Sequence, residues 1–301
     1  MKGLYVKLFF FMASFGAVLN ANASTLTIGR VSNDPEKTHR QLKPILDYVV
    51  DKLRDVGVGD GAIKIAKDQN EMIGFLKQGK VDWVQKGVFD ALAYQKDAGA
   101  EIVLRSWREQ VPNYYSIIFS RKDSAIGLLK DLVGKKIAFQ DKDSTSAFFV
   151  PSAVLRKAGY ALVELSSPSE KVPAGKIGYV FAGKELSITT WVHRGLADAG
   201  AYHNQNWEKP TDNPEGMKKD LRIIYQGKPM PRMIEMFAKD FDTKIKVKLK
   251  QVLLHAHEDP AAKEALKAYG PDTAKFDEFK GKTKEELTEA MSLAKYMSVP
   301  Q

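Results

Sequence analysis

The 301-residue chain contains no cysteine. Disulfide bonds, thiolate catalysis and cysteine-ligated metal sites are therefore excluded, and the fold has to be held together by its own core. The chain also lacks an apolar run of the about 20 residues that a membrane-spanning helix needs. No glycine-rich loop has the spacing of a Walker or Rossmann nucleotide site.

Charge of one sign is not concentrated anywhere in the chain. The formal net charge of +9 comes from 46 Lys and Arg against 37 Asp and Glu, and the two kinds alternate along the sequence. Such a pattern is typical of a mixed solvated surface, so we expect no nucleic-acid partner. A mildly positive background would still help an anionic ligand to approach.

The first 23 residues have the pattern of a secretory signal peptide. Lys2 and Lys7 precede an apolar run from Leu8 to Leu19, and Ala21-Asn22-Ala23 forms a small-x-small cleavage site. We expect a mature protein that starts at Ser24 and diffuses freely in a bacterial periplasm. It should carry no lipid anchor, because that anchor is attached to a cysteine.

Strand and helix patterns alternate along the chain, which predicts an α/β fold. The first half opens with an expected strand at 26–31, a helix at 38–56 and a strand at 62–66. After Gly134 the same layout begins again, with a strand at 136–139, a helix at 146–155 and a strand at 176–180. The residues from Lys239 to Ser298 have helical patterns.

A short repeat supports the two-half layout. Gly79-Lys-Val-Asp82 and Gly195-Leu-Ala-Asp198 each follow an expected helix and lead into an expected strand. The glycine suits a helix C-terminus, and the far end of each strand should face a cleft between the halves.

We therefore predict two lobes, each with a mostly parallel sheet flanked by helices, and two hinge crossings. Residues 24–119 and 223–301 should form lobe 1, and residues 120–222 an inserted lobe 2. The crossings are expected near Ser120 and Arg222, with the strand at 221–225 returning to lobe 1. A hinged architecture of this kind binds its ligand between the lobes.

The segment Asp143-Ser144-Thr145-Ser146 stands where a strand leads into a helix. Free backbone N–H groups, the helix dipole and three hydroxyls would converge there, which suits a tetrahedral oxyanion. Ser, Thr and Asp are also the residues that ordinarily cap helices, so an N-cap is the alternative interpretation.

The chain resembles the periplasmic phosphonate-, phosphite- and phosphate-binding proteins of ABC importers. The resemblance is carried by three blocks, residues 114–124, 129–139 and 143–151. It implies the type II periplasmic-binding-protein fold, with oxyanion contacts from Ser144, Thr145 and Ser146. It also implies a small anionic ligand and an ABC permease at the inner membrane as partners, with no cofactor.

Further candidate ligand contacts each have a plain structural alternative. Gln85 and Lys86 stand where the family commonly has Gly-Pro; Lys86 would pair with an anion or be a solvated lysine. Glu185 would bind a ligand ammonium group or be a surface acid. Tyr94, Tyr114 and Tyr115 would offer phenol hydrogen bonds or be half-buried packing residues.

Enzyme and metal interpretations have less support. Ser144 or Ser146 with His193 or His203 would give a hydrolytic triad, but the chain has no Gly-x-Ser-x-Gly elbow. The His255-Ala-His257-Glu-Asp259 run places its histidines on different helix faces, which indicates a polar helix end. We therefore expect no catalytic residue and no metal site.

The sequence thus predicts a monomeric solute-binding protein that closes over a small oxyanion, a phosphonate or a related phosphorus compound, and passes it to an ABC permease. A periplasmic partner that senses ligand for a signalling receptor remains the alternative. Binding of a different small molecule in the same fold also stays open.

Overall fold

The computed structural model describes residues 23–270 and 272–297. The expected signal peptide, residues 1–23, lies outside these ranges apart from Ala23. Within them, no helix has both the length and the apolar character needed to cross a membrane.

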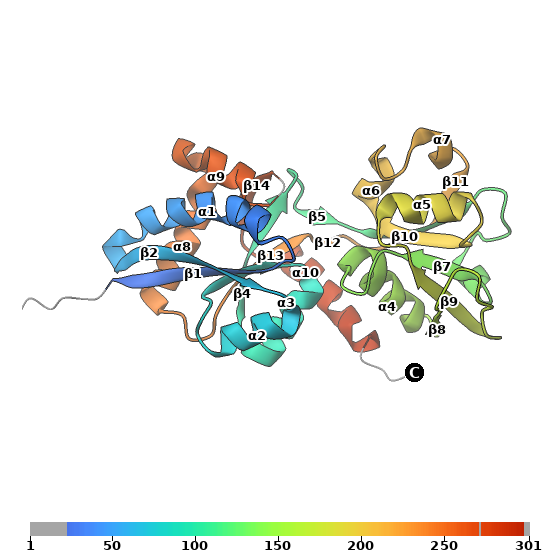
Figure 1. The fold of residues 1–301 in the computed structure, drawn as a ribbon, viewed down its shortest axis with the longest axis horizontal. Coiled ribbons are helices and arrows are strands. Elements are labelled where there is room, and N and C mark those ends of the chain that lie inside the picture. Colours follow the sequence, from blue (N-terminus) through green and yellow to red (C-terminus); the bar gives the residue numbers. More distant parts are fainter. Residues whose placement is uncertain (1–22, 271, 298–301) are drawn as a thin grey trace, which may run out of the picture.

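Two lobes lie side by side, each built on a six-stranded sheet (Figure 1). The first sheet has the strand order β14-β4-β13-β3-β1-β2. β1 pairs in parallel with β2 and β3, whereas β13 runs antiparallel between β3 and β4. Its strands are β1 (Ser24–Val31), β2 (Val58–Ala66), β3 (Trp83–Lys86), β4 (Glu101–Arg108), β13 (Met233–Phe237) and β14 (Thr273–Asp277).

Helices cover both faces of the first sheet. α1 contacts both α8 and α9 on one face, and α2 and α3 contact each other on the other (Figure 1). Their bounds are α1 (Pro35–Lys52), α2 (Gln69–Lys77), α3 (Val88–Ala98), α8 (Thr243–His255) and α9 (Lys263–Ala268), with α10 (Lys282–Ser292) packed on α3.

The second sheet has the order β11-β6-β10-β7-β9-β8. β10, β7, β9 and β8 pair in parallel, and β6 is antiparallel to both of its neighbours. Its strands are β6 (Ser116–Arg121), β7 (Lys136–Phe139), β8 (Ala161–Glu164), β9 (Lys176–Phe181), β10 (Ala199–His203) and β11 (Leu221–Gln226). Its helices are α4 (Val150–Lys157), α5 (Glu185–His193), α6 (Asn204–Glu208) and α7 (Glu215–Lys218).

Helical spacing of apolar residues explains the longest helix. In α1, Leu42, Ile45, Leu46 and Val49 are each at most 1% exposed, as a stripe at i, i+3, i+4 and i+7 requires. The Asp34 side chain accepts from the backbone N–H of Lys37 and so caps the helix. The α/β alternation and the two-lobe type II fold predicted from the sequence are confirmed.

Two parts of the sequence prediction are wrong in detail. The stretch after Lys239 was expected to be helical throughout, but β14 lies within it and forms the edge of the first sheet. Residues 221–225 do not return to the first lobe, because β11 pairs along β6 at the edge of the second sheet. Both are edge strands, so β14 has a weak pattern of its own and the predicted strand at 221–225 carries no local signal for the sheet it joins.

The lobes are joined by a two-stranded ribbon. β5 (Asn113–Tyr114) pairs with β12 (Met230–Pro231), and this pair lies between the two large sheets (Figure 1). The connections therefore run through residues 113–115 and 227–231, rather than near Ser120 and Arg222, since the strands that contain Ser120 and Arg222 belong to the second sheet.

The Gly-x-x-Asp repeat forms the same turn and the same type of hydrogen bond in both lobes. Gly79 and Gly195 have φ of +62° and +73°, which glycine adopts without strain. The Asp82 carboxylate accepts from the Thr27 backbone N–H at 2.7 Å, and that of Asp198 accepts from Lys136 N–H at 2.8 Å. Each aspartate therefore fixes the start of one short strand against its neighbour.

Candidate ligand-binding site

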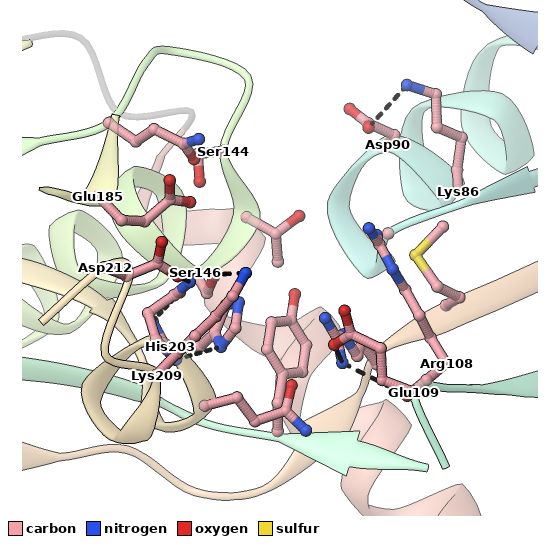
Figure 2. A pocket seen from close by; sticks show the side chains of 18 residues that line it. Lys86, Asp90, Arg108, Glu109, Ser144, Ser146, Glu185, His203, Lys209 and Asp212 are labelled. Atoms are coloured by element: carbon pink, nitrogen blue, oxygen red, sulfur yellow. Dashed lines mark hydrogen bonds and ion pairs between the residues drawn. The ribbon is translucent and has the colours of Figure 1, made fainter. Parts of the chain in front are cut away.

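A cavity of about 470 Å³ lies between the lobes, beside the ribbon that joins them. β3 and β10, the two strands that follow the Gly-x-x-Asp repeats, end at Lys86 and His203, and both residues line it. Figure 2 shows Lys86, Asp90, Arg108 and Glu109 of the first lobe on one side and Ser144, Ser146, Glu185 and His203 of the second lobe on the other. The far ends of these strands thus face the cleft, as the repeat predicts.

The hydroxyl-rich segment supplies the second-lobe wall. Residues Thr145–Phe149 form a π-helical turn that continues into α4, and Ser144 is its N-cap. The Ser144 Oγ accepts from Ala147 N–H at 3.2 Å, so the capping interpretation holds for this residue. Ser144, Thr145 and Ser146 all line the cavity.

Tyr114 brings a further hydroxyl to the same wall. Burial raises the pKa of its phenol to about 12, although the charge of Arg232 and the nearby hydroxyls of Ser146 and Thr145 act in the opposite direction. Tyr114 therefore stays protonated and can donate as well as accept.

Tyr115, the tyrosine chosen from the sequence, does not line the cavity. It packs instead against the second-lobe core that contains Phe119 and Tyr202, and its backbone N–H donates to Asn204 Oδ1. Successive side chains of an extended chain point to opposite sides, so an error of one position exchanges a cavity residue for a core residue.

Gln85 and Tyr94 also lie outside the cavity. Gln85 Nε2 donates to Ser106 Oγ and Glu235 Oε1 within the first lobe. Tyr94 is completely buried in the first-lobe core, and burial raises the pKa of its phenol. Gln85 precedes Lys86 on one strand and points away from it, and Tyr94 lies on the packed face of α3.

Two arginines line the cavity beside the joining ribbon. Arg232 is buried, and its Nη1 pairs with Glu109 Oε2 at 2.8 Å. Arg108 ends β4, and its Nε is buried without a hydrogen-bond partner among the described residues. Burial lowers the pKa of Arg108, and the charge of Arg232 lowers it further.

His203 lies in a part of the cavity that is surrounded by cationic side chains. Burial lowers the pKa of its imidazole to about 3, and the charges of Arg232, Arg108 and Lys209 act in the same direction. Its Nδ1 accepts from the Asn206 backbone N–H at 3.3 Å. The neutral ring therefore sits among three cations.

Carboxylates neutralise most of the cations that line the cavity. Lys86 pairs with Asp90 at 3.2 Å, and Lys209 with Asp212 at 3.7 Å. With the pair of Arg232 and Glu109, this leaves two charged side chains without an ion-pair partner among the described residues: Arg108 on the first lobe and Glu185 on the second.

Sequence reasoning found five cavity residues, Lys86, Ser144, Thr145, Ser146 and Glu185. It missed residues on α3, β4, α6, the joining ribbon and the neighbouring loops, because local sequence patterns do not show which distant segments meet at the cavity. The missed polar residues are Asp90, Arg108, Glu109, Gln140, Gln205, Asn206, Lys209, Asp212 and Arg232. Tyr114 was considered beside Tyr115 as a phenol donor, and His203 only for a triad.

The geometry gives no support to a hydrolytic triad. His193 Nε2 lies 3.1 Å from Asp220 Oδ2, and neither residue lines the cavity. The imidazole of His203 accepts at Nδ1 from a backbone N–H, where a triad would have a carboxylate. His255 pairs with Glu258 at 3.0 Å, and residues 23–270 and 272–297 hold no group of three or more potential metal-ligating side chains.

Comparison with known proteins identifies the family. Residues 31–283 match the family described as the periplasmic substrate-binding protein of the phosphonate ABC transporter. The chain belongs to this family. It is therefore related to the substrate-binding components of transporters, and the family description places such proteins in the periplasm.

Relatives agree with this membership. The phosphonates-binding periplasmic protein of Escherichia coli K12 is 25% identical over 252 residues, which are 81% of this chain and 70% of that protein. XAC2383 from Xanthomonas citri, in a structure bound to ATP, is 32% identical with a TM-score of 0.84 over 92% of this chain and all of that one. PhnD1 from Prochlorococcus marinus, in complex with methylphosphonate, shares the fold at 15% identity, with a TM-score of 0.62 over 92% of this chain and 99% of that one.

Proposed function

We propose that this protein captures a small phosphorus oxyanion in the interlobe cavity and delivers it to an ABC permease. The observation that carries the proposal is the convergence of three hydroxyls, from Tyr114, Thr145 and Ser146, at the start of a helical segment inside the cavity. Hydroxyls and free N–H groups at a helix start suit a tetrahedral anion.

The electrostatics of the cavity fit the same class of ligand. Arg108, Arg232 and Lys209 lower the pKa of His203 through their charges, so an anion entering here is attracted. The named relatives supply further support, since a phosphonate, methylphosphonate and ATP all carry phosphoryl oxygens. The unpaired Glu185 would suit an ammonium group on the same ligand.

Closure of the lobes, rather than chemistry, is the proposed mechanism. The ring of Phe89 on α3 stacks on that of Phe149 on the second lobe, with centroids 3.7 Å apart. A ligand that contacts both walls binds more tightly to the closed form and shifts the hinge equilibrium towards it. We propose that a monomer exported to the periplasm without a lipid anchor presents this closed form to the permease.

Calorimetric titration of protein freed from bound ligand by unfolding and refolding tests the proposal. Methylphosphonate, aminoethylphosphonate, phosphite, phosphate and sulfate are the ligands to compare. Thr145→Ala or Ser146→Ala should each weaken binding of the preferred phosphorus compound at least about tenfold, since a charge-assisted hydrogen bond contributes about 1.5–3 kcal/mol.

Ser152→Ala is the matched control. Ser152 is buried in the same helical segment, but its Oγ has no partner among the described residues, and it does not line the cavity. Its removal should leave affinity unchanged. Unchanged affinity in the Thr145 and Ser146 variants, or no binding of any phosphorus compound, would refute the proposed site.

A further inference from the structure

The turn that carries Arg108 holds a backbone conformation that is unusual for its residues. Glu109 and Gln110 have φ of +50° and +62°, in the left-handed region that non-glycine residues rarely adopt. The turn is closed by Val111 N–H to Arg108 O at 3.0 Å, and Glu109 N–H donates to Asp272 O at 3.0 Å. Strain of this kind is retained where surrounding contacts impose it, commonly beside functional sites.

The turn leaves one guanidinium uncompensated inside the cavity. Glu109 pairs with Arg232, not with Arg108, and Arg108 Nε has no partner among the described residues although it is buried. A buried donor without a partner is costly, and two neighbouring guanidiniums repel. An anion bound beside Arg108 would remove both costs.

Tyr114 adjoins both this position and the hydroxyl wall. The hydroxyls of Ser146 and Thr145 act on its phenol, and so do the charges of Arg232 and Arg108, with Arg232 Cζ 6.0 Å from the ring centroid. The cavity of about 470 Å³ is in the range that accommodates drug-sized ligands, far beyond a bare phosphonate. Glu185 is on the opposite side from Arg108 (Figure 2), so it does not compete for the same ligand group.

We propose that the preferred ligand carries, besides its phosphoryl group, a second anionic group that binds at Arg108. This inference rests on the proposed function, because it assumes that the phosphoryl group occupies the wall formed by Tyr114, Thr145 and Ser146. It makes Arg108 a specificity-determining residue, with Arg232 and Glu109 holding it in place.

Phosphonoacetate and phosphonoacetamide test the proposal, since they have nearly the same size and differ in the second charge. Wild-type protein should bind phosphonoacetate at least about tenfold more tightly than phosphonoacetamide, as expected for a charge-assisted hydrogen bond. Methylenediphosphonate, in which the second anion is a phosphoryl group, distinguishes the two sources of that charge. Tighter binding of phosphonoacetate or of methylenediphosphonate, the two compounds with a second anionic group, than of phosphonoacetamide supports the proposal.

Substitutions at Arg108 then test whether this residue causes the preference for phosphonoacetate over phosphonoacetamide. Arg108→Gln should abolish it, by weakening the binding of phosphonoacetate at least about tenfold more than the binding of phosphonoacetamide, since a neutral second group gains nothing from the charge. Arg108→Lys should retain part of it, because lysine keeps the charge but not the planar fork. Arg121→Gln is the matched control: it removes an exposed arginine that pairs with Asp123 outside the cavity, and it should preserve the preference.

The outcomes separate this inference from the proposed function. Equal binding of phosphonoacetate, phosphonoacetamide and methylenediphosphonate would overturn the second-anion site and leave the phosphoryl site standing. Equal weakening of all ligands by Arg108→Gln would also overturn it, since Arg108 would then belong to the phosphoryl site. Absence of any phosphonate binding in folded wild-type protein would overturn both proposals.

Discussion

Gly87 and Thr145 meet across the two lobes: a Cβ added to Gly87 would lie 2.8 Å from Thr145 Oγ1. Gly87 is the N-cap of α3 on the first lobe, and Thr145 begins the π-helical turn on the second. The absence of a side chain at Gly87 therefore permits the observed approach of the lobes.

Gly87→Ala should hinder closure and weaken ligand binding by at least about fivefold, since overpacking costs about 1–3 kcal/mol. Gly87→Ser should do the same while supplying a favoured N-cap residue. Gly74→Ala, within α2 with open space around it, is the control and should leave affinity unchanged. Calorimetry checks all three; wild-type affinity in both Gly87 variants would contradict the closure contact.

A buried carboxylate on β13 joins that strand to β3 and to the segment before β14. Glu235 is fully buried and accepts from Trp83 Nε1 at 2.7 Å, Gln85 Nε2 at 2.9 Å and Tyr269 Oη at 2.7 Å. Glu235→Gln should lower the free energy of unfolding by about 3 kcal/mol, because its amide group presents a donor to existing donors. Urea unfolding measures the loss.

A double-mutant cycle with Tyr269→Phe isolates one of these bonds. Tyr269→Phe alone should cost about 1.5–3 kcal/mol, and the two changes together should cost at least about 1 kcal/mol less than their sum. Strictly additive losses would show that the Tyr269 hydroxyl does not depend on the Glu235 carboxylate.

The depressed pKa of His203 predicts a loss of stability at acidic pH. The unfolded imidazole takes up a proton below its ordinary pKa of 6.5, whereas burial keeps the folded one neutral down to about pH 3. Stability is therefore lost as the pH falls below 6.5. Between pH 7 and pH 5, wild-type protein should lose about 2 kcal/mol more than His203→Gln.

Urea unfolding of both proteins at several pH values checks this difference. The comparison removes the contribution of other titrating groups, which the two proteins share. Parallel pH profiles for the two proteins would show that the folded imidazole is free to protonate.

The paired aspartates of the repeat should act alike. Asp82→Ala and Asp198→Ala each leave a backbone N–H, of Thr27 or Lys136, without its side-chain acceptor. Each should lower the free energy of unfolding by about 1–3 kcal/mol. The asparagine variants retain an acceptor oxygen and should lose less than half as much; equal losses for Ala and Asn would point to charge instead of the hydrogen bond.

The sequence predicted those features of the fold and of the cavity that depend on residues close together in the chain. Helical spacing at Leu42, Ile45 and Leu46 and the hydroxyl run at 144–146 are contained in a few neighbouring residues. These features therefore predicted α1 and one wall of the cavity correctly. The Gly-x-x-Asp repeat is equally local, and it predicted that the two strands that follow it end at the cleft.

What the sequence left undetermined depends on contacts between distant segments. Arg105 bonds with Asp277, and Glu235 with Tyr269, through side chains far apart in the chain. Arg108 enters the cavity only because the two crossings pair as a ribbon. Local periodicity carries no information on such pairings, so the first-lobe side of the cavity could not be predicted beyond Lys86.

The ends of the second lobe lie next to each other, because Gly227 N–H donates to Ser116 O at 2.8 Å. β6 and β11, the strands that begin and finish this lobe, are also antiparallel neighbours. The second lobe is therefore one uninterrupted stretch of chain between these two junctions. Replacing that stretch would leave every strand pairing of the first sheet intact. Exchanging it between relatives would transplant the hydroxyl-bearing half of the cleft and leave its arginine-bearing half in place.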